Sequence, residues 1–144
     1  MEYVATLSKE GRYTLVEFPD CPGCSTFVDP DEGEDVESVA REALEGWLVA
    51  HLEDGDAPPP ATTRSTGSRN EIVIRVAPTL AIALQIRWRR QELGLSQAQL
   101  GKLLGVSRQQ AASLENPDSN LRMSTLEKAA TALKLELEVE LHPA

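Results

Sequence analysis

The chain has 144 residues, enough for one domain of ordinary size or two small ones. Hydrophobic residues make up 41% and charged residues 26%, which is typical of globular proteins. No apolar run approaches the roughly 18 residues that a membrane helix needs, and the N-terminal residues lack the pattern of a signal peptide. Two cysteines are too few for a disulfide framework. We therefore expect a cytoplasmic protein that makes no membrane contact.

The formal net charge of -9 is unevenly distributed. Residues 1–60 contain three basic side chains and fifteen acidic ones, whereas residues 61–144 contain eleven basic and eight acidic. The first part would repel nucleic acid and attract a basic partner, and the second could tolerate DNA. The charge pattern therefore predicts two modules with different partners.

The first module begins with features of a small β-sheet. Apolar and polar residues alternate weakly over 2–7, and residues typical of β-strands follow over 13–18. A turn at 8–11 separates these two runs, and the arrangement predicts a hairpin. Turn-forming residues at 19–23 then lead to a predicted third strand at 24–28.

An amphipathic helix is predicted over 36–52, because its apolar residues recur at spacings of three and four. It follows an acidic stretch over 29–37, which would favour the helix dipole or bind a partner. A Pro-rich segment over 57–70 precedes a predicted strand at 71–76 that would complete the sheet, so we place this segment as a long loop inside a first domain of residues 1–78.

The second domain, residues 79–144, is predicted to be helical until its last residues. Helices are expected over 80–93, 97–104, 108–114 and 124–133, with Gly94, Ser96, Ser107 and Pro117 marking their ends.

In the last segment apolar residues and glutamates alternate strictly, and this pattern predicts a half-buried strand over 135–141. A single strand needs a partner, and the same strand of a second copy would supply one. We therefore predict a homodimer, with a dimer of dimers as an open alternative. The dimerisation residues would be Leu135, Leu137, Val139 and Leu141.

Residues 97–116 carry the pattern of a helix-turn-helix. Gly101 would allow the two helices to approach closely, and Gly105 permits the left-handed turn between them. Apolar residues occupy the positions between the helices: Leu100, Leu104, Val106, Ala111 and Leu114. The pattern resembles the Cro/phage-repressor (XRE) family over residues 82–133.

This resemblance implies a recognition helix at 108–114 that reads DNA. Arg108, Gln109 and Ser113 match positions that face base edges, since arginine and glutamine can grip guanine and adenine. Backbone or phosphate contacts would come from Gln97, Ser107, Asn116 and Arg122. The resemblance also implies a structural ion pair between Arg90 and Glu115.

The first domain resembles a second family. Tyr3, the run 13–18, the motif Phe-Pro-Asp-x-Pro-Gly-Cys at 18–24 and the helix around Trp47 are similar to the N-terminal domain of HicB-type antitoxins. The acidic stretch Asp29–Asp35 departs from that family's pattern.

The HicB resemblance implies an α+β protein with a β-β-β-α-β partial RNase-H-like domain followed by an all-α helix-turn-helix domain. It implies that the first domain binds a HicA-type toxin, a small basic ribonuclease that cleaves mRNA, and covers its active site. It further implies that the protein represses its own operon. The candidate toxin-binding residues are Phe18, Pro19, Asp20, Pro22, Asp31 and Glu32.

Other functions remain as alternatives. Cys21 and Cys24 form a C-x-x-C pair, but they lie in a turn that enters a strand rather than at a helix start, and only His51 and His142 remain as further zinc ligands. We therefore expect no metal, no cofactor and no enzymatic activity. The runner-up is a free-standing repressor whose first domain senses a small ligand or, through the two cysteines, redox state.

Overall fold

The computed structural model describes residues 1–144 and divides into two compact units, Met1–Ala81 and Ile82–Ala144. Each unit is described by itself. The division falls inside helix α2 (Pro78–Glu92), whose first residue is the end of the first domain predicted from the sequence. No helix is long and apolar enough to cross a membrane.

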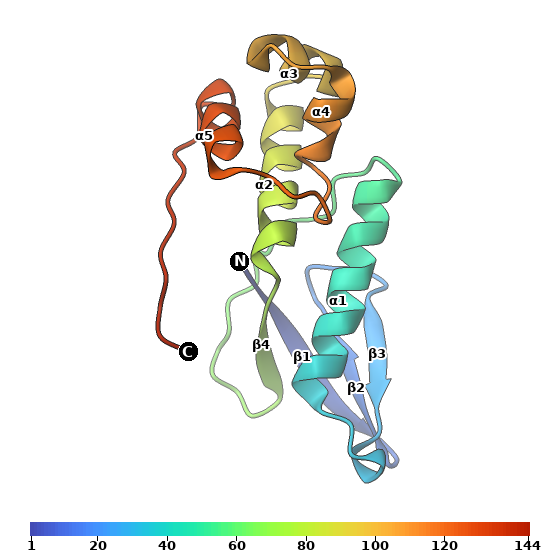
Figure 1. Ribbon diagram of the computed structural model, residues 1–144. Coiled ribbons are helices and arrows are strands. Elements are labelled where there is room, and N and C mark those ends of the chain that lie inside the picture. The colour runs from blue at the N-terminus through green and yellow to red at the C-terminus, as the bar shows by residue number, and fades with distance from the viewer. The chain divides into compact units, whose positions relative to one another are not determined.

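Unit 1 contains a four-stranded sheet in which every neighbouring pair is antiparallel (Figure 1). The strands are β1 (Glu2–Glu10), β2 (Tyr13–Glu17), β3 (Ser25–Val28) and β4 (Glu71–Arg75), in the spatial order β3-β2-β1-β4. With the helix between β3 and β4, the predicted element order β-β-β-α-β is confirmed.

Helix α1 (Val36–Glu53) covers one face of this sheet (Figure 1). Asp35 caps its first turn, since its carboxylate accepts from the backbone N of Ser38 at 2.9 Å. The buried side chains of α1 recur every four residues, at Ala40, Leu44, Leu48 and Leu52, and so form one stripe along the helix. They pack on a sheet face whose buried residues include Tyr3, Ala5, Val16, Val28 and Ile74.

The Pro-rich segment 57–70 has no regular secondary structure, but hydrogen bonds tie it to unit 1. The carboxylate of Asp20 accepts from the backbone N and the hydroxyl of both Thr62 and Thr63, at 2.9–3.0 Å. Pro58 is fully buried, and the Tyr3 hydroxyl donates to the Pro59 carbonyl at 3.3 Å. The segment is therefore a loop that hydrogen bonds hold against unit 1, rather than a linker between domains.

Unit 2 consists of the C-terminal part of α2 with α3 (Gln97–Leu104), α4 (Arg108–Ser113) and α5 (Met123–Ala132). All four helices start and end within two residues of the predicted bounds. One side chain or more from each contributes to a single apolar core, made of Ile86, Leu100, Ala111, Leu114, Leu126, Ala129 and Leu133.

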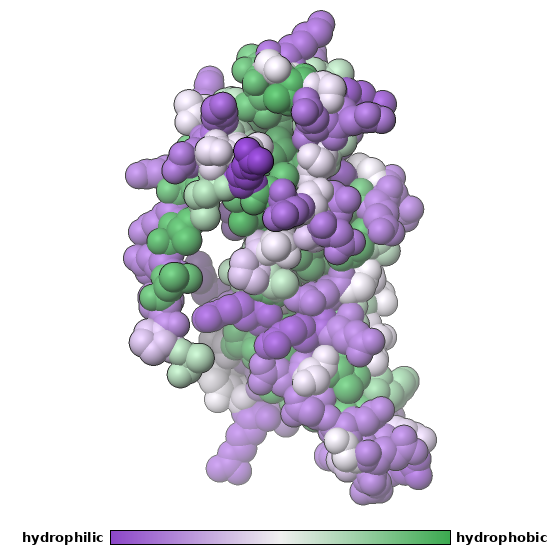
Figure 2. All heavy atoms as spheres, viewed as in Figure 1, coloured by the Kyte–Doolittle hydropathy of each residue, from purple (hydrophilic) through white to green (hydrophobic).

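The strand predicted over 135–141, which would pair with a second copy, is not formed in the single chain: residues 135–144 have no regular secondary structure. Leu141 is 94% exposed and Val139 59%, whereas Leu137 packs partly against the core of unit 2. Hydrophobic side chains stand out along this tail at the left of Figure 2. A strand needs a neighbouring strand for its backbone hydrogen bonds, and unit 2 has none. The dimer that this segment would form stays a prediction.

Candidate nucleic-acid interface

Two short helices joined by a tight turn form the candidate interface, and both begin with the same capping arrangement. Ser96 caps α3 and Ser107 caps α4. In α4 the Ser107 Oγ accepts from the Gln110 backbone N at 3.1 Å, and the Gln110 Oε1 accepts from the Ser107 backbone N at 3.0 Å. Such capping boxes satisfy backbone N–H groups that a helix start would otherwise leave without partners. The sequence pattern Ser-x-x-Gln therefore fixes where each helix begins.

The turn between α3 and α4 depends on two glycines for different reasons. Gly105 ends α3 with a φ of 68°, in the left-handed region that favours glycine. Gly101 lies inside α3 on the side that packs against the turn, and a Cβ there would stand 2.9 Å from the Val106 carbonyl oxygen. The backbone N of Val106 also donates to the Gly101 carbonyl at 2.9 Å. This close approach holds α4 at a fixed position against α3.

The first turn of α4 presents two side chains to solvent. Arg108 and Gln109 are both exposed, and neither side chain makes a hydrogen bond or ion pair within the chain. Their side chains are long enough to reach outward, and both types can form paired hydrogen bonds with a purine edge. Arg108 and Gln109 are thus free to contact a ligand.

The other candidates on this surface have partners inside the domain. Ser113 Oγ donates to the Gln110 carbonyl at 2.6 Å, and Asn116 Oδ1 accepts from the Asp118 backbone N at 2.9 Å. Arg122 is exposed at the start of α5 and makes no capping hydrogen bond. It lies with Ser113 and Lys128 along a groove beside α4. Arg122 is therefore placed for contact, whereas Ser113 and Asn116 also stabilise local structure.

Gln97 is held by a buried cluster of charges. Its Nε2 donates to Glu115 Oε2 at 3.1 Å, and that carboxylate also pairs with Arg87 and Arg90. Glu115 is 3% exposed; burial raises its pKa, but the hydrogen bonds from Arg90, Arg87 and Gln97 outweigh this and hold the pKa below its ordinary value. The Arg90–Glu115 pair predicted from the sequence is confirmed, and it joins α2 to the end of α4.

The structural roles of three residues of this domain were not predicted from the sequence. Arg87 joins the Glu115 cluster, Gln110 completes the cap of α4, and Lys128 lines the groove beside α4. The spacing of three between Arg87 and Arg90 and the Ser-x-x-Gln pattern carry signals for the first two. No local signal marks Lys128, because its place depends on how α5 packs against α3 and α4.

In unit 1, the candidate toxin-binding residues divide into two groups. Phe18 is 3% exposed and belongs to the core, and the carboxylate of Asp20 is occupied by Thr62 and Thr63. Pro19, Pro22, Asp31 and Glu32 are exposed, the last two in a 3-10 turn (Pro30–Glu32) after β3. Hydrophilic side chains cover this acidic turn at the lower right of Figure 2. Only the second group is open to a partner.

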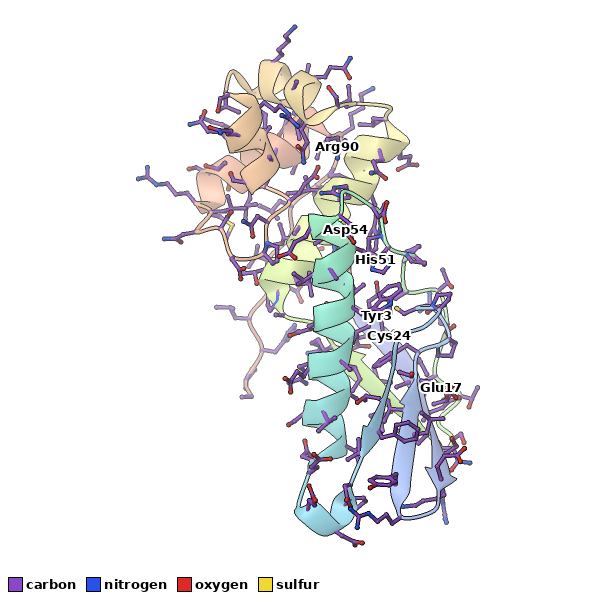
Figure 3. All side chains as sticks on the ribbon, turned by 90° about the vertical axis from the view of Figure 1, so that its right-hand side faces the viewer. Tyr3, Glu17, Cys24, His51, Asp54 and Arg90 are labelled. Carbon is purple, nitrogen blue, oxygen red and sulfur yellow. The ribbon has the colours of Figure 1, made fainter.

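The two cysteines are free thiols buried in unit 1. Burial raises the pKa of Cys21 to about 12 and the pKa of Cys24 to about 11. Figure 3 shows Cys24 close to α1, and its Sγ lies 3.8 Å from the Ala43 carbonyl oxygen. Such thiols are poor nucleophiles at neutral pH, since the reactive species is the thiolate. No group of three or more His, Cys, Asp or Glu side chains is arranged to hold a metal ion.

Residues 86–139 match a protein family described as Helix-turn-helix. No curated protein matches the chain. The match covers the last seven residues of α2 and the whole of α3, α4 and α5. Unit 2 is accordingly a helix-turn-helix domain, the class of domain through which many transcriptional regulators bind DNA.

Proposed function

We propose that this protein is a transcriptional repressor that reads DNA with the first turn of α4. The observation that carries this proposal is the exposed pair Arg108 and Gln109 on a helix that a capped, glycine-dependent turn fixes in place. Arg122 and the backbone N–H groups at the start of α4 would contact phosphates and set the register. A dimer with recognition helices about 34 Å apart would read a palindromic operator.

We further propose that unit 1 makes the protein an antitoxin of the HicB kind. Three features support this: the β-β-β-α-β order, the Phe-Pro-Asp-x-Pro-Gly-Cys motif at 18–24 and the excess of acidic residues over 1–60. In this proposal unit 1, itself a partial RNase-H-like domain without catalytic activity, occludes a basic HicA-type ribonuclease toxin. Electrostatic attraction between the two would speed their association. DNA binding by unit 2 would then repress the operon that encodes both proteins.

A sensor of small ligands is the alternative for unit 1. A pocket in this unit is lined by Leu7, Ser8, Lys9, Thr14, Val36, Arg69 and Asn70, which gives it a mixed polar and apolar wall. Apolar ligands favour sites lined mainly by hydrophobic and aromatic side chains, so this pocket fits a polar ligand better. The raised pKa values of Cys21 and Cys24 count against redox sensing.

Co-purification tests the antitoxin proposal. The untagged chain is expressed together with the tagged product of the small open reading frame beside its gene, and the mass of the purified complex is measured. We expect a stoichiometric complex, and we expect expression of the neighbour alone to stop growth. A neighbour that does not bind, or is harmless alone, overturns the antitoxin proposal and leaves the repressor proposal standing.

A second experiment tests the repressor proposal on its own. Binding of the purified chain to DNA from upstream of its gene is measured by electrophoretic mobility shift against scrambled DNA of equal length. We expect a specific complex whose affinity falls steeply with salt, because phosphate contacts release counterions. Equal affinity for both DNA molecules would overturn sequence-specific repression.

A further inference from the structure

The sheet face opposite α1 carries an exposed aromatic patch, which we define as Tyr13, Leu15 and Phe27. Tyr13 and Leu15 lie on β2, and Phe27 lies on the edge strand β3 directly opposite Leu15. Phe27 is 57% exposed and Tyr13 40%, and their rings meet edge to face with centroids 6.1 Å apart. Figure 3 shows Tyr3 between α1 and the sheet and Glu17 on the other side, the side of this patch.

The placement of aromatic side chains in this chain is uneven. The sequence contains only two Phe and two Tyr. Phe18 and Tyr3 are buried in the core of unit 1. Phe27 and Tyr13 are instead exposed to solvent and contact each other. A single exposed apolar residue is ordinary, but two aromatic rings in contact on an open sheet face form the kind of centre that protein interfaces use.

Acidic side chains lie on the strands of the aromatic patch and in the turn that follows β3. Glu10 pairs in register with Tyr13, and Glu17 lies two residues beyond Leu15 on the same face. Asp31 and Glu32 follow β3 in the exposed 3-10 turn. The one cation beside the patch, Arg12, is paired with Asp29 at 2.5 Å. The surface is therefore an apolar centre with a negative rim.

The Tyr13 ring already accepts a cation. The guanidinium carbon of Arg12 lies 4.9 Å from the ring centroid. Aromatic faces attract cations through the negative charge of their π-systems. A partner's arginine or lysine would find the same attraction at the exposed Phe27 ring, strengthened by the carboxylate of Glu17 on the same sheet face.

We infer that the aromatic patch and its acidic rim are the surface on which unit 1 binds its basic protein partner, and this inference rests on the proposed antitoxin function. A basic partner fits because an acidic rim complements its charge. A second copy of this chain would bring two acidic rims together and be repelled. The motif residues Phe18 and Asp20 act instead inside unit 1, in the core and at the loop 57–70.

The test compares two substitutions on the same sheet face. Phe27→Ser removes the exposed ring on β3, and Val73→Ser is the matched control, because Val73 is 43% exposed on the same face but lies on the opposite edge strand β4. Affinity for the neighbouring gene's purified product is measured by calorimetry. We expect Phe27→Ser to weaken binding about thirtyfold or more, as loss of an interface hot spot does, and Val73→Ser to leave it unchanged. Circular dichroism and DNA binding check that each variant is folded.

A second pair of variants tests the acidic rim. Glu32→Lys reverses an exposed charge in the turn that follows β3, and Glu53→Lys reverses an exposed charge at the end of α1. We expect the first to slow association severalfold at low salt and the second to have little effect. If the wild-type chain binds and Phe27→Ser and Glu32→Lys bind equally well, the inference fails while the antitoxin proposal stands. If the wild-type chain does not bind at all, both fail.

Discussion

Arg90 Nη2 lies 3.1 Å from Oε2 of Glu115, and both side chains are buried. The same carboxylate pairs with Arg87 and accepts from Gln97. The Glu115 side chain thus links α2 to the end of α4 and orients Gln97, the first residue of α3. The position of α4 depends on this cluster as well as on apolar packing.

Replacing Glu115 by glutamine should strongly destabilise unit 2. The substitution keeps the size of the side chain but removes the buried carboxylate charge that pairs with Arg87 and Arg90. Breaking a buried ion pair from one side costs about 3–5 kcal/mol, and we expect a loss of that order in denaturant unfolding. Glu92→Gln, which breaks the exposed pair with Arg89, is the control and should change stability little.

The contribution of Glu115 should depend on pH. Because its pKa in the folded chain lies below the ordinary value of 4.5, the carboxylate stabilises the fold above about pH 4.5. The contribution should be lost as the pH falls further, through the folded pKa. The difference in stability between wild type and Glu115→Gln should therefore shrink below pH 4.5; a constant difference down to pH 3 would contradict the assignment.

Arg108 and Gln109 should carry most of the base recognition. Replacing either by alanine should cost about 1–3 kcal/mol of binding to the specific operator, while non-specific binding changes less. Arg122→Ala is the comparison: as a phosphate contact it should weaken binding to all sequences alike and reduce the salt dependence. Equal loss of specific and non-specific binding in Arg108→Ala would show that Arg108 contacts only phosphate.

Asp20→Ala should release the loop 57–70. The four hydrogen bonds from Thr62 and Thr63 would be lost, and Arg64 and Arg69 would become better trypsin sites. We expect cleavage after these arginines to be severalfold faster than in wild type, as followed by mass spectrometry. Glu42→Ala, on the exposed side of α1, should leave the cleavage rate unchanged.

Two glycine-to-alanine substitutions should have opposite effects. Gly46 lies in α1 with nothing within 4 Å of an added Cβ, so alanine there should stabilise by about 0.5–1 kcal/mol. Gly101→Ala would place a Cβ 2.9 Å from the Val106 carbonyl oxygen, so it should lower stability despite the better helix propensity of alanine. Thermal unfolding of both variants gives the comparison, and stabilisation by Gly101→Ala would show that the turn can move away.

The buried cysteines should react slowly. With pKa values raised to about 12 and 11, Cys21 and Cys24 have little thiolate at pH 8. We expect alkylation by iodoacetamide to be on the order of a hundredfold slower in the native chain than in urea. Fast native alkylation, together with DNA affinity that changes on oxidation, would favour the redox alternative.

Interactions close in sequence could be predicted without the fold. Ser96, Ser107 and Gly105 set the bounds of α3 and α4 through caps and a left-handed turn, and these act over three or four residues. The order of strands and helices, the uneven charge and the helix-turn-helix pattern likewise followed from the sequence by itself.

The tertiary structure decided what each side chain contacts. Asp20 meets Thr62 across 42 residues and Gln97 meets Glu115 across 18, so no local pattern revealed that these candidates are already occupied. Of the two phenylalanines, only packing determined that Phe18 is buried and Phe27 exposed. The tail 135–141 has the alternation of a strand but no neighbour to pair with in the single chain, because backbone pairing needs a second strand in space.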